Sequence, residues 1–153
     1  MPITVSGLDK VRNEFEKIIK KIDSPEVMRR LGMFIITTVR ERTRGTGRGV
    51  GRPGGNPSRL KAVTLPYAIW RAKQLRHPQA ASGRSSNLTF SGRMLDGMIV
   101  KQATKSSLFI GFKRQADSDK AEYQEKQGRR FLVLSGKEIR DAAAFVKLQL
   151  SKR

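Results

Sequence analysis

The sequence predicts an α+β fold in a single domain, 1–153, with an N-terminal helix pair and a C-terminal helix packed on a small antiparallel sheet. Two observations predict it. Apolar residues recur with helical spacing at both ends of the chain, and two β-favouring runs, 98–104 and 107–113, are joined by a short polar turn. A length of 153 residues fits one domain with its own core.

The first predicted helix covers residues 6–22, where Ser6 offers an N-cap and Asp9 follows three residues later. Apolar residues then recur every three or four positions: Leu8, Val11, Phe15, Ile18, Ile19 and Ile22. A second helix begins at Ser24–Pro25, because serine caps well and proline suits the first helical turn. We expect it to end near Thr43, where glycines follow.

The middle of the chain predicts two loops and two short helices. Residues 44–64 form a long glycine-rich loop, and residues 77–87 form a second, flexible loop. The run LPYAIWRAKQLR between them predicts a short helix that starts after Pro66, and LTFSGRMLDGM predicts another that starts near Ser91.

The C-terminal third predicts the sheet and the closing helix. The two β-favouring runs form a hairpin, and a charged, partly helical segment ends at Gly128. RRFLVL reads as a short strand or an extended run. Ser135 and Glu138 have capping-box spacing, and a helical apolar stripe continues from Ile139 to Leu150.

The charge of the chain is its strongest functional signal. There are 32 Lys and Arg against 13 Asp and Glu, which gives a net charge of +19. Such a chain attracts polyanions, and nucleic acid is the expected partner. An acidic membrane surface and an acidic protein are the other partners that this charge fits.

The basic residues are concentrated in one segment. Eleven of them lie between Arg42 and Arg93, and no Asp or Glu occurs between Glu41 and Asp96. We expect sequence-independent phosphate contact, because arginines in a glycine-rich loop can follow a backbone without reading bases. The predicted contact residues are Arg42, Arg44, Arg48, Arg52, Arg59 and Lys61. The loop is expected to be disordered in the isolated subunit and ordered in an assembly.

The residue types argue against catalysis and against a cofactor. The chain has no cysteine and a single histidine, His77, so no metal site is predicted. Gly49, Gly51 and Gly54 match GxGxxG but have no strand before and no helix after them, which a dinucleotide site requires. The carboxylates of residues 117–125 lie in a polar segment with no predicted pocket, so we expect no enzyme. The apolar runs are short, as at Met33–Ile36, and predict no membrane span.

The aromatic residues fit packing better than base stacking. Tyr67, Trp70, Phe90 and Phe112 lack the pattern of RNA-recognition domains, so core packing is expected. Trp70, next to Arg71, is the exception, and both are interface candidates because Trp and Arg anchor protein interfaces.

The order of the elements carries a family resemblance. The helix opening VSGLDKV, the helix beginning Ser91-Gly92-Arg93-Met94-Leu95, the hairpin, Arg130-Phe131-Leu132 and the last helix follow one another in the chain. This order resembles the neck and tail-completion proteins of tailed bacteriophages, the virion morphogenesis group. The basic segment sits where those proteins carry a variable loop.

The resemblance implies a structural function. Several copies would form a homo-oligomeric ring in the virion neck, after assembly in the host cytoplasm. The ring would join the portal or adaptor side of the head to the tail proteins, with genome DNA in its lumen and no membrane involved. A basic loop facing that lumen would contact the duplex non-specifically, since DNA carries about one charge per 1.7 Å.

Two alternatives remain open from the residues alone. The chain could be a free, sequence-independent DNA- or RNA-binding protein, which its charge alone would support. Within the ring hypothesis, the arginines could instead dock onto an acidic patch of a neighbouring protein.

Overall fold

A computed structural model describes residue 13 and residues 16–152. Most of the predicted helix 6–22 therefore lies outside the described residues, although residues 16–19 are helical. Helix α2 (Pro25–Arg40) starts as predicted, with Pro25 in its first turn and the Ser24 Oγ accepting a hydrogen bond from the Glu26 amide at 3.2 Å. The helical backbone continues past Arg40 as a π-helix, η1 (Glu41–Gly45), and so extends beyond the expected end near Thr43.

The predicted hairpin is confirmed, and both predicted short helices are present with shifted starts: one at Leu65 instead of after Pro66, the other at Arg93 instead of near Ser91. Strands β3 (Met98–Ala103) and β4 (Leu108–Phe112) pair antiparallel, with a register shift between Val100 and Gln102. Helix α4 (Arg93–Asp96) precedes the hairpin, and helix α5 (Gln115–Lys126) follows it. The last helix, α6 (Gly136–Ser151), begins with the expected capping box.

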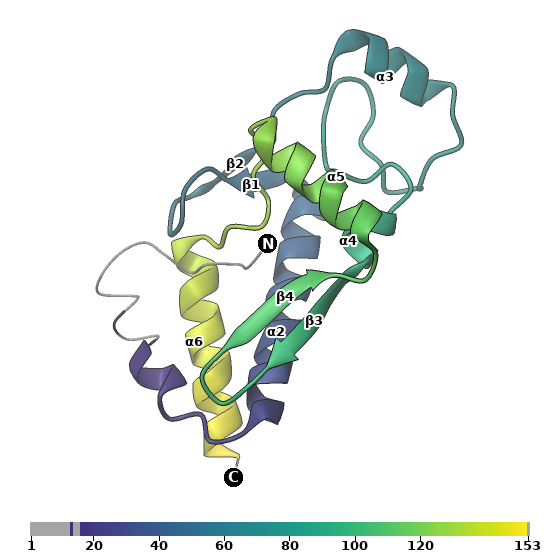
Figure 1. The fold of residues 1–153 in the computed structure, drawn as a ribbon. Helices are drawn as coiled ribbons and strands as arrows, with labels where there is room; N and C mark the ends of the chain where they lie inside the picture. The colour runs from purple at the N-terminus through teal and green to yellow at the C-terminus, as the bar shows by residue number, and fades with distance from the viewer. Residues whose placement is uncertain (1–12, 14–15, 153) are drawn as a thin grey trace.

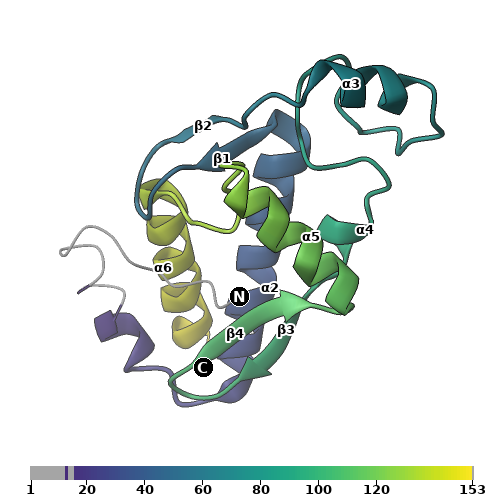
Figure 2. The same cartoon turned by 45° about the horizontal axis from the view of Figure 1, so that its top comes forward.

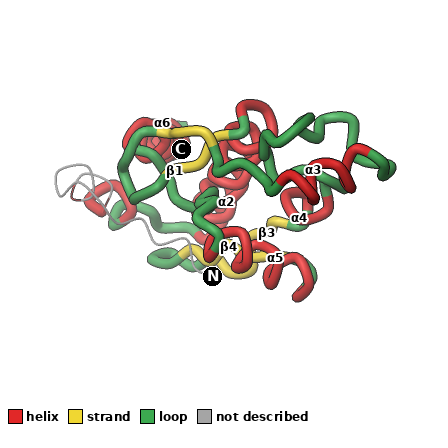
Figure 3. The backbone as a smooth tube through the Cα atoms, turned by 90° about the horizontal axis from the view of Figure 1, so that it is seen from above, coloured by secondary structure: helices red, strands yellow, loops and turns green. Residues whose placement is uncertain are grey.

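Helix α2 lies between two layers, with α6 on one side and the β3–β4 hairpin on the other (Figures 1 and 3). Gly32 permits the close approach of α2 to the hairpin, because a Cβ at this position would lie 2.5 Å from the Val100 Cγ2. On the other side the rings of Phe34 and Phe145 stack with their centroids 4.8 Å apart. These contacts confirm the α+β class: α2 packs on the small antiparallel sheet of β3 and β4, and α6 packs on α2.

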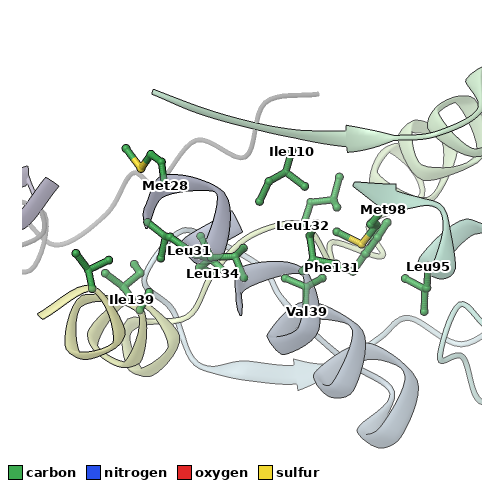
Figure 4. Packing of buried hydrophobic residues seen from close by; sticks show 14 of the residues in the cluster. Met28, Leu31, Val39, Leu95, Met98, Ile110, Phe131, Leu132, Leu134 and Ile139 are labelled. Atoms are coloured by element: carbon green, nitrogen blue, oxygen red, sulfur yellow. The ribbon is translucent and has the colours of Figure 1, made fainter. Parts of the chain in front are cut away.

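The RRFLVL run supplies core residues without forming a strand. Phe131, Leu132 and Leu134 are buried in one core cluster, where Phe131 and Leu132 lie near Val39 and Met98, and Leu134 lies near Ile139 (Figure 4). The Val50 amide donates to the Arg130 carbonyl at 3.1 Å, which attaches the run to the segment after η1. The run bends at residues 132–133, so it is neither a strand nor extended throughout.

The prediction of a single loop over residues 44–64 is wrong. The segment contains the end of η1 and two strands, β1 (Arg48–Val50) and β2 (Pro57–Arg59), which pair antiparallel. Gly49 serves close packing, whereas a Cβ at Gly45 or Gly51 would meet nothing within 4 Å. At Gly49 a Cβ would lie 1.9 Å from the Arg130 carbonyl oxygen, so only glycine lets β1 approach the RRFLVL run this closely.

Residues 61–91 form an arm that projects from the body, with helix α3 (Leu65–Ala72) farthest out (Figure 2). The predicted loop 77–87 contains no helix or strand. No residue of α3 belongs to the main hydrophobic core. The arm is instead tied together by polar groups, among them Asn87, whose side-chain amide donates to the carbonyls of Arg44 and Gln79.

Candidate nucleic-acid interface

Four of the six predicted contact residues lie together on the β1–β2 hairpin. Arg48 and Arg59 are register partners in the ladder, so their side chains leave the same face. Arg52 lies in the connection between the strands, and Lys61 follows β2 by two residues. All four are exposed, and no acid among the described residues forms an ion pair with any of them.

The hairpin holds these cations on a packed base. Val50 is fully buried, and the Leu60 amide donates to the Gly47 carbonyl at 2.8 Å where the two strands close. The Gly54 amide donates to the Leu134 carbonyl at 2.9 Å, which attaches the connection to the body. The charges are therefore presented by an ordered ladder instead of a loose loop.

Arg129 and Arg130 join this group from a distant part of the chain. The Arg130 Nη1 donates to the Gly51 carbonyl at 2.8 Å. The Arg129 Nε donates to the Lys61 carbonyl at 3.0 Å, and its Nη2 donates to the Ala62 carbonyl at 3.1 Å. Neither guanidinium forms an ion pair with a described acid, so no acid compensates them beside the hairpin. We call the six residues the cationic surface: Arg48, Arg52, Arg59, Lys61, Arg129 and Arg130.

Arg42 does not belong to this surface, in contrast to the prediction. Only 8% of the residue is exposed, and its Nη1 lies 2.6 Å from the Glu138 Oε2. The guanidinium also donates to the carbonyls of Phe131 and Val133. Burial lowers the pKa of Arg42 below its ordinary value, and the Glu138 charge opposes this shift. Arg42 thus joins η1 to α6 inside the protein and is not available to phosphate.

Arg44 is also engaged within the fold. Its Nη2 lies 2.6 Å from the Asp96 Oδ1, and the guanidinium is mostly covered. The same turn is held by Arg40, whose guanidinium donates to the carbonyls of Leu95 and Met98. The two ends of the segment without acids therefore lie side by side. Asp96, just beyond its C-terminal end, compensates the charge of Arg44 near its N-terminal end.

The two interface candidates of the arm differ in exposure. Trp70 is about half exposed, and its ring packs between those of Tyr67 and Phe90 at centroid distances of 5.6 and 5.3 Å. Arg71 is buried, and its Nη2 donates to the carbonyls of Gly83 and Ser85 at 2.5 and 3.0 Å. Burial lowers the pKa of Arg71. Trp70 remains accessible to a protein partner, whereas Arg71 holds the arm together.

Within the part of the chain that the structure describes, no three His, Cys, Asp or Glu side chains come together as metal ligands. The same residues include no helix that is long and apolar enough to cross a membrane. Comparisons with protein-family models, with curated proteins and with solved structures found no match to this chain. The cationic surface, the arm and the order of the elements are therefore the features that bear on function.

Proposed function

We propose that this chain is a non-enzymatic structural subunit of a tailed-phage virion. Several copies would form a ring in the neck that joins the head to the tail. The cationic surface would contact the genome DNA without reading its sequence. The ring, the neck and the virion come from the resemblance in the order of elements, and the DNA contact comes from the structure of the hairpin.

The observation that carries the DNA contact is the unpaired charge of the β1–β2 hairpin. Two exposed cations, Arg48 and Arg59, lie opposite each other in the ladder, and Arg52 and Lys61 lie next to it. The neighbouring Arg129 and Arg130 add two more. Like charges opposite each other in a ladder destabilise it, so the arrangement favours an anionic partner that neutralises them. A phosphate backbone supplies closely spaced anions, and their contacts need no base recognition.

The exposed apolar residues of α3 support self-association. Leu65, Ile69 and Trp70 are each about half exposed, although α3 is only eight residues long. The centres of protein interfaces are enriched in aromatic residues such as Trp70. A head-to-tail contact that closes by rotation would cover this face in every subunit of a ring.

The proposal is tested by the size and shape of the purified protein and by its behaviour with particles. We expect light scattering and electron microscopy to show closed rings, alone or after addition of phage head or tail extracts. A protein that stays monomeric at every concentration and never joins particles would contradict the ring.

The second candidate is a free, sequence-independent nucleic-acid-binding protein, which the same cationic surface supports. It predicts tight DNA or RNA binding by a monomer or dimer, with affinity that falls steeply with salt. Measuring mass and affinity in the same buffer separates the two candidates, because only the first predicts a ring.

A further inference from the structure

A cleft of about 380 Å³ separates the arm from helix α5, next to the cationic surface. It lies within the size range of ligand sites, about 300–1,000 Å³. None of its lining residues is Asp or Glu, although α5 itself carries several acids. Aromatic, amide and cationic side chains contribute to the lining instead: Tyr67, Phe90, Tyr123, Gln124, Gln127, Arg71, Lys120 and Arg129.

Two tyrosines offer accessible rings to this cleft from two elements. Tyr67 of α3 is 40% exposed, and Tyr123 of α5 is 58% exposed. Trp70 packs on Tyr67 with centroids 5.6 Å apart, which holds that ring in place. A planar ring held by its neighbours, with part of its surface in solvent, is the usual platform for a stacked base. The expectation that Tyr67 serves core packing is therefore wrong, because the structure exposes it.

One residue that lines the cleft, Arg71, has a buried hydrogen-bond donor without a partner. Arg71 is 4% exposed, and its Nε has no hydrogen-bond partner among the described residues. A buried donor without a partner destabilises the fold, so a ligand acceptor that reached it would recover free energy. Gln124 and Gln127 add donors and acceptors of the kind that pair with base edges.

The cleft is continuous with the cationic surface. Arg129 belongs to both, and its guanidinium donates hydrogen bonds to the carbonyls of Lys61 and Ala62. The next two residues, Val63 and Thr64, line the cleft. A nucleic-acid strand whose phosphates lay on the hairpin would therefore pass directly beside the cleft.

We propose that this cleft binds an unpaired nucleotide base, stacked on Tyr67 or Tyr123, of a single strand whose phosphates lie on the cationic surface. The proposal deepens the proposed DNA contact and depends on it. It adds a preference for single-stranded segments, because a base inside a duplex cannot leave its stack without a free-energy cost. An acidic peptide also fits the charge, but the paired tyrosines and the amides favour a base.

The test compares a fluorescein-labelled oligo-dT of about 16 nucleotides, which covers the usual site sizes, with a duplex of the same length. Binding is measured by fluorescence anisotropy at fixed salt. Tyr123→Ala and Tyr67→Ala should each weaken oligo-dT binding by about five- to a hundredfold, the loss of one stacked base, and leave duplex binding unchanged. Tyr123 is well exposed on α5, so its variant also tests the cleft if Tyr67→Ala perturbs the arm.

Phe109→Ala is the matched control, because Phe109 is a partly exposed aromatic on β4 that does not line the cleft. It should leave both affinities unchanged. Unchanged oligo-dT binding in both tyrosine variants would overturn the proposal, as would an equal loss of duplex binding. Tyr123-dependent binding of oligo-glutamate, but not of oligo-dT, would show a peptide site and overturn it too. Failure of the proposed DNA contact gives a different result: replacing the hairpin cations would then leave the binding of both oligo-dT and the duplex unchanged.

Discussion

Arg48 and Arg59 are opposite each other across the β1–β2 ladder, and neither is paired with an acid among the described residues. Like charges directly opposite destabilise an antiparallel pair. The ladder is stabilised elsewhere, by buried Val50 and by the backbone bonds that attach it to residues 130–134. The fold therefore holds two repelling guanidinium groups in place, as a site for an anionic partner requires.

The first prediction concerns the salt dependence of duplex binding. Replacing all four hairpin cations by alanine should reduce the slope of log affinity against log salt by about three to four, since each lost phosphate contact removes about 0.9. The variant is Arg48→Ala, Arg52→Ala, Arg59→Ala and Lys61→Ala combined. A salt titration of duplex affinity measures the slope.

The control removes the same charge from the other end of the molecule. Arg29, Lys105, Lys147 and Lys152 are exposed and lie at the start of α2, in the β3–β4 turn and at the end of α6. Their combined replacement by alanine changes the net charge equally but should leave most of the slope intact. Equal slopes in the two variants would mean that the protein's total charge, and not the hairpin, binds DNA.

The second prediction separates binding from stability at one residue. Arg59→Ala should leave the free energy of unfolding unchanged or raise it by up to about 1 kcal/mol, because it removes the repulsion with Arg48. The same variant should weaken duplex binding. Urea unfolding and DNA titration test the pair of effects. A clear loss of stability would show that Arg59 supports the ladder and does not strain it.

The third prediction concerns Arg42. Arg42→Ala should lower the free energy of unfolding by about 3–5 kcal/mol, because it leaves the buried Glu138 carboxylate without its partner. Urea unfolding measures the loss, and the exposed Arg52→Ala is the matched control, expected within about 0.5 kcal/mol of the parent chain. A small effect at Arg42 would contradict its structural role and return it to the candidate contact residues.

The fourth prediction concerns the glycines of the hairpin. Gly49→Ala should lower the free energy of unfolding by about 1–3 kcal/mol or more, because its Cβ would collide with the Arg130 backbone. Gly51→Ala is the control, since nothing lies within 4 Å of a Cβ there. Thermal unfolding compares the two. Equal stabilities would mean that β1 is not fixed to residues 130–134.

The sequence predicted those elements whose signals are local. The Ser24 cap, the Ser135–Glu138 capping box and the β-favouring runs each act within a few residues, and each marked a real boundary. Long-range partners could not be predicted in this way. Arg42 and Glu138 are 96 residues apart, and Arg44 and Asp96 are 52 apart, so composition alone placed two structural arginines among the surface ones.

The glycine-rich hairpin was missed for a related reason. Its two strands have three residues each, and the only apolar side chain of β1 is Val50. The partner that stabilises them is the backbone of residues 130–134, which no local pattern indicates. The same pairing brings Arg130 to the hairpin. The adjacent basic residues Arg129 and Arg130 were a visible signal, but only the fold shows where they lie.

The last prediction concerns the apolar face of α3 and the ring. Ile69 is 51% exposed and lies one helical turn from exposed Leu65, so both belong to the same face. Ile69→Glu should convert rings to monomers, because a charge would have to be buried without a partner in the subunit contact. It should leave the monomer's stability nearly unchanged, as an exposed substitution does.

Gln74→Glu is the control for Ile69→Glu, because it places the same charge on an exposed part of the arm and should leave the rings intact. Light scattering of the three proteins gives their masses, and unfolding curves confirm that each is folded. If rings persist in Ile69→Glu, subunits associate through another face; if both variants dissociate them, the net charge of the arm controls assembly and the apolar face does not.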